Sequence, residues 1–182
     1  TVAHCAEDMG SNWVLTINGT DHDVAEVILH PDYQGGNWDL ALIRLDSPVQ
    51  GVTPYPLYRD TDEQGQTLTL VGRGLHATGL EGEQGGSMDQ QLRRAENVVS
   101  NTNDHWLEVR FEEPSEGGVL PLEGVGAAGD SGGPAFIETP QGLFIAGLNS
   151  WGDAFPYSNI GKDGAWDYPT RIRSYGDWID GT

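Results

Sequence analysis

The sequence predicts an all-β protein made of many short antiparallel strands. Its 182 residues include 26 glycines and ten prolines, which favour tight turns and interrupt long helices. Short apolar runs, such as residues 13–17 and 40–45, are separated by polar turn signals. A chain of this length can bury one substantial core or two smaller ones.

In the first half of the chain, two apolar runs flank a turn. Residues 13–17 and 24–29 are separated by Asn18-Gly19-Thr20-Asp21, and both Asn and Gly tolerate positive φ. Residues 40–45 are almost continuously apolar, which is typical of a strand buried on both faces. We therefore expect three strands here, with Asp39 at the edge of the core.

The second half contains further strand patterns, beyond a proline-rich and acidic segment that ends at residue 66. Residues 75–91 are rich in Gly and Gln and lack apolar periodicity, so we expect a long, mobile, exposed loop that is open to self-cleavage. The expected strands are 67–74, 92–100, 105–111, a hairpin of 134–138 with 143–148, and 168–172, followed by a terminal helix at 174–179.

Charge and cysteine content exclude several classes of function. The formal net charge is −19, from 28 acidic and nine basic residues, so the protein should repel nucleic-acid phosphates. No apolar run approaches a membrane span, and we expect no membrane partner. Cys5 is the single cysteine, so no disulfide can form within these residues. Cys5 is either a small buried thiol or the partner of a cysteine that precedes Thr1.

The strongest candidate for a reactive site is the segment Gly129-Asp130-Ser131-Gly132-Gly133-Pro134. The glycines let a substrate carbonyl approach the backbone and let two N–H groups point at one oxyanion. Ser131 is a weak nucleophile unless a base accepts its proton and a third group orients that base. The chain offers both: His4 in Thr1-Val2-Ala3-His4-Cys5, and Asp39 directly before the apolar run 40–45.

These three segments, in the order His, Asp, Ser, resemble those of the trypsin/chymotrypsin-like serine peptidases. The resemblance implies catalytic roles for His4, Asp39 and Ser131, with an oxyanion hole formed by the N–H groups of Gly129 and Ser131. In the family, Asp130 would pair with an N-terminal ammonium group and so hold the oxyanion loop in shape. No cofactor and no metal are implied.

The family's fold consists of two packed antiparallel six-stranded Greek-key barrels and a short C-terminal helix. By this resemblance, residues 1–58 would be the remainder of the N-terminal barrel, incomplete at its N-terminus. Residues 59–66 would be the inter-barrel linker. Residues 67–182 would form the C-terminal barrel with the nucleophile, the substrate pocket and the terminal helix.

The resemblance also places the substrate pocket. Ser150-Trp151-Gly152 would form one wall and pair with an extended substrate. Val125 falls where members that cleave after arginine or lysine carry an aspartate, which favours apolar or small substrate side chains. Asp167 falls near another pocket-floor position, where an acid would receive a cation. Basic and apolar specificity therefore both stay open.

The sequence thus predicts a serine endopeptidase that works through an acyl-enzyme intermediate. Its partners would be polypeptide substrates and proteinaceous inhibitors, and its location would be extracellular or periplasmic, as the resemblance implies. The alternative is an inactive homologue that binds peptides or a partner protein in the same cleft. An esterase using the same three residues is a third interpretation.

Overall fold

The computed structural model describes residues 1–10, 12–153 and 160–182 of the chain. The chain consists of two compact units, Thr1–Tyr55 and Pro56–Thr182. Strands dominate both units, which confirms the all-β prediction. Across the described residues, no helix is long and apolar enough to cross a membrane.

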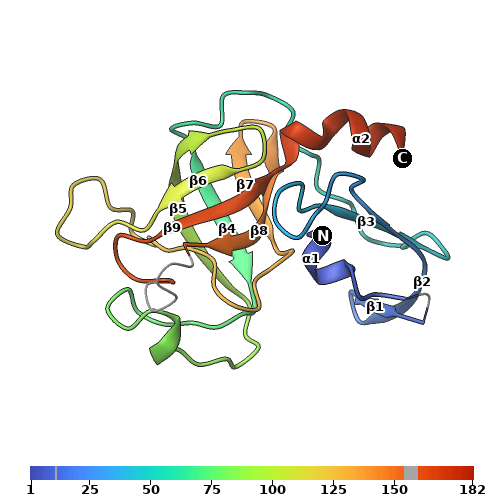
Figure 1. Cartoon of the computed structure of the whole chain (residues 1–182), viewed down its shortest axis with the longest axis horizontal. Helices are drawn as coiled ribbons and strands as arrows, with labels where there is room; N and C mark the ends of the chain where they lie inside the picture. Colours follow the sequence, from blue (N-terminus) through green and yellow to red (C-terminus); the bar gives the residue numbers. More distant parts are fainter. Residues whose placement is uncertain (11, 154–159) are drawn as a thin grey trace. The chain divides into compact units, whose positions relative to one another are not determined.

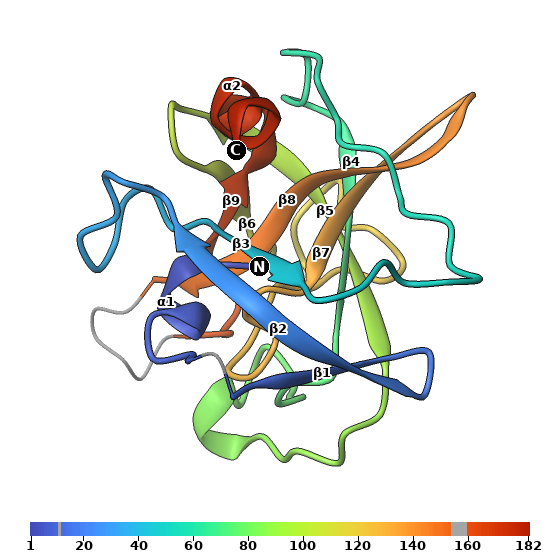
Figure 2. The same ribbon diagram turned by 90° about the vertical axis from the view of Figure 1, so that its right-hand side faces the viewer.

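The first unit is a three-stranded antiparallel sheet preceded by one helical turn. Its elements are α1 (Ala3–Ala6), β1 (Val14–Ile17), β2 (Thr20–Leu29) and β3 (Ala41–Leu45). The long β2 lies between the other two strands (Figure 2). Asn18 and Gly19 join β1 to β2 with φ of 50° and 76°, as the Asn-Gly signal predicts. The sequence contains no periodic signal for α1, because four residues make only one turn.

A small core fixes α1 to the sheet. Ala3 and Ala6 are buried against Ala41 at the start of β3, and partly buried residues of β2 pack around them. The N–H of Ala41 also donates to the carbonyl of Thr1 at 2.9 Å. These contacts bring α1 beside the residue that precedes β3, although 35 residues separate them in the chain.

The second unit is a closed six-stranded barrel in the order β4-β5-β6-β9-β8-β7, with all neighbours antiparallel (Figure 1). This confirms the barrel predicted for the second half. The strands are β4 (Thr67–Gly72), β5 (Arg93–Thr102), β6 (Leu107–Arg110), β7 (Pro134–Thr139), β8 (Gly142–Gly152) and β9 (Trp166–Arg171). The short helices are η1 (Glu83–Gly85), η3 (Ile172–Tyr175) and α2 (Gly176–Gly181), and α2 confirms the predicted C-terminal helix.

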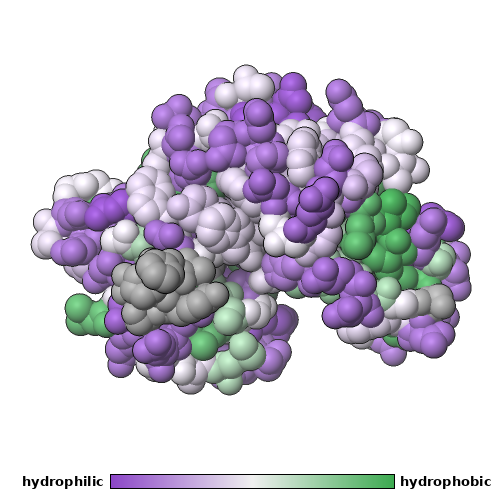
Figure 3. All heavy atoms as spheres, viewed as in Figure 1, coloured by the Kyte–Doolittle hydropathy of each residue, from purple (hydrophilic) through white to green (hydrophobic). Residues whose placement is uncertain are grey.

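Alternating apolar residues of these strands fill the barrel. The buried cluster contains Tyr58, Leu68, Leu70, Val99, Leu107, Val109, Ala135, Ile137 and Ala146. On the face of the molecule that Figure 3 shows, hydrophilic residues are more common than hydrophobic ones, as the excess of acidic side chains predicts.

Residues 56–66, most of which were expected to link two barrels, group with the second unit. The N–H of Tyr58 donates to the carbonyl of Ile145 on β8 at 2.9 Å. Glu63 is fully buried and accepts two hydrogen bonds from Arg171 on β9, from Nε at 2.7 Å and from Nη2 at 2.8 Å. This ion pair ties the segment to the barrel.

Candidate active site

His4 and Asp39 form a hydrogen-bonded pair within the first unit. His4 lies on α1, and Asp39 lies two residues before β3. The Asp39 carboxylate meets Nδ1 of His4 at 2.7 Å through Oδ2 and accepts the backbone N–H of His4 at 2.9 Å through Oδ1. Asp39 is 3% exposed, so the ring sits against a carboxylate that is largely removed from water. Two contacts to one carboxylate fix both the backbone and the ring of His4.

This pairing determines the tautomer and basicity of the imidazole. A carboxylate acceptor at Nδ1 keeps the proton on that nitrogen and leaves Nε2 with a lone pair. The hydrogen bond that Nδ1 of His4 donates to Asp39 is the largest cause that raises the pKa of His4 above its usual 6.5, and desolvation opposes this shift. The pairing with Asp39 therefore stabilises the protonated form of His4 and leaves Nε2 as the proton acceptor of the neutral ring.

Ser131 lies in the tight loop between residue 125 and β7. Gly129 and Gly132 have φ of 91° and 79°, values that L-residues with side chains rarely adopt. The N–H of Gly132 donates to the carbonyl of Asn149 on β8 at 2.8 Å, which anchors the loop to the barrel. Within the described residues, the N–H groups of Gly129 and Ser131 have no acceptor. Two such donors beside a hydroxyl could bind an oxyanion.

Asp130 supports this loop from behind. Its Oδ1 accepts the N–H of Gly74 at 2.7 Å, and its Oδ2 accepts the N–H of Ala127 at 3.1 Å. A Cβ at Gly72 would overlap the Asp130 carboxylate, so β4 must end in glycine to admit it. In the part of the chain that the structure describes, no basic side chain pairs with Asp130. Two backbone N–H groups stand where the resemblance implied an ammonium group.

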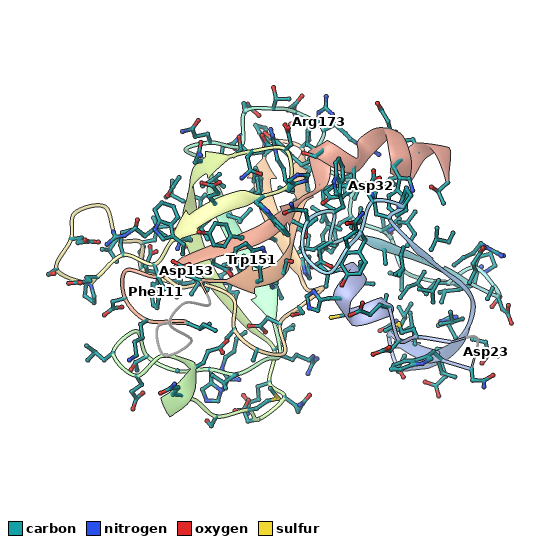
Figure 4. All side chains as sticks on the ribbon, viewed as in Figure 1. Asp23, Asp32, Phe111, Trp151, Asp153 and Arg173 are labelled. Carbon is teal, nitrogen blue, oxygen red and sulfur yellow. The ribbon has the colours of Figure 1, made fainter. Side chains whose placement is uncertain are left out.

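Most of the predicted substrate-binding residues of the second unit line one cavity of about 240 Å³ together with Ser131. These residues are Ser131, Ser150, Trp151, Gly152 and Asp167. Val125 is placed elsewhere, because it packs against the barrel core and lines a neighbouring cavity. Trp151 lies near the end of β8 (Figure 4) and stacks on Tyr168 of β9 at 4.3 Å between ring centroids. An aromatic wall and a carboxyl group therefore face the same space.

Asp167 is a buried acid in this cavity. It is 4% exposed, and its Oδ2 accepts the N–H of Gly126 at 3.1 Å. Burial raises the pKa of Asp167 to about 7, and the negative charges of Asp130 and Glu83 add to the shift. Among residues 1–10, 12–153 and 160–182, no cationic side chain pairs with it.

Two polar residues of this cavity have no signal in the sequence analysis. Asn149 donates to the carbonyl of Val71 at 3.2 Å, but its buried Oδ1 has no donor among the described residues. Glu83, from the loop between β4 and β5, reaches the N–H of Ala128 at 2.6 Å. The position of Asn149 directly before Ser150-Trp151-Gly152 could have identified it, whereas nothing in the local sequence distinguishes Glu83 from other acidic loop residues.

Comparison with known proteins gives consistent matches. The family model described as Trypsin matches residues 1–179. Vitamin K-dependent protein C of Mus musculus is 26% identical over 201 residues, which cover 98% of this chain and 42% of that protein. A trypsin-like protease of Streptomyces glaucescens is 28% identical over 181 residues, which cover 88% of this chain and 63% of that protein. The chain thus spans about two fifths of the length of the mouse, rabbit and rat protein C sequences that it matches.

Proposed function

Because the chain belongs to the trypsin family, we propose that it is a serine endopeptidase with Ser131 as nucleophile, His4 as general base and Asp39 as the group that orients His4. In this mechanism Nε2 of His4 removes the hydroxyl proton as Ser131 attacks the peptide carbonyl. The N–H groups of Gly129 and Ser131 stabilise the oxyanion. His4 then returns the proton to the leaving amine, and water hydrolyses the acyl-enzyme.

The observation that carries this proposal is the His4–Asp39 pair. A buried carboxylate that holds Nδ1 at 2.7 Å and the backbone N–H of the same histidine at 2.9 Å specifies one tautomer and one ring orientation. A histidine that acts as general base requires this fixed tautomer and ring orientation. The unfilled N–H groups of the Ser131 loop supply the complementary half of the chemistry.

We further infer that the side chain before the scissile bond is cationic. The cavity beside Ser131 holds Asp167 and the carbonyl oxygen of the Asn149 side chain, which are a buried acid and a buried acceptor without a donor. A guanidinium or ammonium group brings both positive charge and N–H donors, so it would satisfy both groups at once. An apolar side chain would leave the Asn149 oxygen without a donor and Asp167 without a counter-ion. Val125, on which the apolar alternative rests, lines the adjoining cavity, which favours the cationic side chain.

Membership of the family also supports polypeptide substrates, proteinaceous inhibitors as further partners, and an extracellular or periplasmic location. The inactive alternative, a homologue that only binds peptides, predicts the same pocket without turnover. Chemical labelling of Ser131 separates these two functions.

The test is the intact mass after treatment with a fluorophosphonate, which reacts with a serine whose base and oxyanion site are assembled. We expect one adduct on the parent chain, none on Ser131→Ala, and one on the matched control Ser115→Ala, because Ser115 lies in an exposed loop. The parent should then cleave peptides after arginine or lysine. A folded parent that forms no adduct would overturn the proposal and favour the peptide-binding alternative.

A further inference from the structure

The loop between β4 and β5 holds both polar groups of a single residue in the Ser131 loop. The N–H of Ala128 donates to Oε1 of Glu83 at 2.6 Å. The carbonyl of Ala128 accepts the N–H of Leu75 at 2.9 Å. Ala128 directly precedes Gly129, whose N–H is one of the two oxyanion donors in the proposed mechanism. The β4–β5 loop therefore acts on the peptide units that lead into the oxyanion site.

Peptide geometry converts these two bonds into a direction for the Gly129 N–H. The carbonyl of Ala128 and the N–H of Gly129 belong to the same planar peptide unit and point in opposite directions. When that carbonyl faces Leu75, the Gly129 N–H must face away from the β4–β5 loop. The Glu83 bond fixes the preceding peptide unit as well, so rotation about the Ala128 backbone is blocked on both sides.

The Glu83 end of this contact is itself anchored. Glu83 begins η1, the short helical turn drawn in green in Figure 1, and its N–H donates to the carbonyl of Ile160 at 3.0 Å. Gly82 is buried with φ of 62°, and a Cβ there would lie 2.8 Å from the same carbonyl. A side chain at position 82 would therefore displace the turn. The expected mobile loop is held in place at the residue that contacts Ala128.

Close approach of backbones supports the same arrangement. A Cβ at Gly74 would lie 2.7 Å from the carbonyl oxygen of Ala128 and 2.7 Å from the nitrogen of Asp130. Glycine at this position lets Leu75 reach the Ala128 carbonyl while Gly74 itself donates to Asp130. The contacts from Gly74 and Leu75 are made by the backbone, and Glu83 adds the contact that depends on a side chain.

We propose that Glu83 is a positioning residue that, together with the backbone of Leu75, restrains the backbone of Ala128 and so keeps the Gly129 N–H in the orientation required for oxyanion binding. This inference rests on the proposed peptidase function and adds a residue to it. The contact is a charge-assisted hydrogen bond to a backbone N–H, which is about twice as strong as a neutral one. Without it, the Ala128 N–H loses its acceptor, and only the Leu75 bond still restrains the peptide unit that carries the Gly129 donor.

Glu83 also lines the cavity that contains Asp167, so its charge could instead act on a cationic substrate. Two substitutions separate these roles. Glu83→Gln removes the charge and keeps an oxygen acceptor, whereas Glu83→Ala removes both. Glu81→Ala is the matched control, because Glu81 is an exposed acid of the same loop whose side chain bonds Thr78 instead of the Ser131 loop.

The first readout is amide hydrogen exchange at Ala128, which needs no activity. We expect exchange to accelerate about tenfold or more in Glu83→Ala, as for the loss of a hydrogen bond of at least 1.4 kcal/mol. Exchange in Glu83→Gln and in Glu81→Ala should stay close to that of the parent. Unchanged exchange in Glu83→Ala would overturn the inference.

The second readout is the kinetics of a peptide anilide. Loss of one oxyanion donor typically costs about 100- to 1,000-fold in kcat, so misorientation in Glu83→Ala should lower kcat by about tenfold or more, with KM little changed. Glu83→Gln should restore kcat to within about threefold of the parent. Equal losses in both variants, expressed mainly in KM, would overturn positioning and indicate a charge effect. A parent without turnover would refute the peptidase proposal. The exchange result would still show whether Glu83 restrains the backbone at Ala128.

Discussion

Replacing Asp167 with asparagine should make the protein more stable at high pH and should weaken its preference for a cationic substrate side chain. The pKa of Asp167 is raised to about 7 by burial, from 3.8 for an ordinary aspartate. In the folded protein the carboxyl group is therefore protonated below about pH 7, whereas in the unfolded chain it loses its proton near pH 4. Folding binds a proton in this window, so the stability of the parent should fall as pH rises through it.

The size of this effect follows from the shift. Between pH 5 and pH 7 the folded state holds about one more proton than the unfolded state, and each pH unit is worth about 1.36 kcal/mol. The parent should thus lose on the order of 3 kcal/mol of unfolding free energy between pH 5 and pH 8.5 through this one group. Asparagine does not titrate, and its side-chain oxygen can still accept the N–H of Gly126. Asp167→Asn should lack this loss.

The assay is urea unfolding of the parent and Asp167→Asn at pH 5 and pH 8.5, with Asp104→Asn, an exposed acid, as the control. The stability difference between Asp167→Asn and the parent should grow in favour of the variant as pH rises. Its preference for arginine over leucine before the scissile bond should fall on the order of 100-fold, as for other buried charge pairs that lose one partner. A variant whose stability difference is the same at both pH values would refute the argument from burial.

Three further predictions concern the remaining parts of the site and its support. The value of kcat/KM should fall as acid protonates His4, and the midpoint should lie above pH 6.5 because Asp39 raises the pKa of His4. A midpoint at or below pH 6.5 would count against the His4–Asp39 pair. Asp39→Asn should lower kcat by about 10⁴-fold. Glu63→Gln should lower the free energy of unfolding by about 3–5 kcal/mol, because Arg171 would keep its charge in a largely buried position, and an unchanged urea midpoint would contradict this. Gly72→Ala should slow fluorophosphonate labelling by at least about tenfold, because its Cβ would displace the carboxylate of Asp130 next to the Ser131 loop. Labelling at the parental rate would contradict this prediction.

The strands were largely predictable because their signals are local. Alternating apolar residues and the Asn18-Gly19 turn specify β1 and β2 through backbone preferences that need no distant partner. The hairpin of β7 and β8 follows from the same reasoning, although β8 extends to Gly152 and so contains the predicted pocket wall. The structure gave β2 four more residues than expected, starting at Thr20, because pairing with β1 supports polar positions that have no strand signal of their own.

The candidate nucleophile and its base could also be proposed from the sequence, since glycine spacing around Ser131 and the order of His4, Asp39 and Ser131 restrict the chemistry. The local environments of these residues could not be predicted from the sequence. That Asp39 is nearly excluded from water, and that two backbone N–H groups satisfy the carboxylate behind the nucleophile, depend on residues far apart in the chain.

The sequence by itself determined the fold class, the position of the proposed nucleophile and the net acidity of the chain, because these follow from local patterns and composition. Only the tertiary structure decided that Asp167, and not Val125, shares a cavity with Ser131, and that Glu83 contacts the peptide before Gly129. Both observations depend on residues that are far apart in the chain and that the closed barrel and its loops bring together. A carboxylate acquires its pKa and its partner from the burial and hydrogen bonds that surround it. The hydrogen-bond partners of Asp167 and Glu83 lie 41 and 45 positions away in the chain.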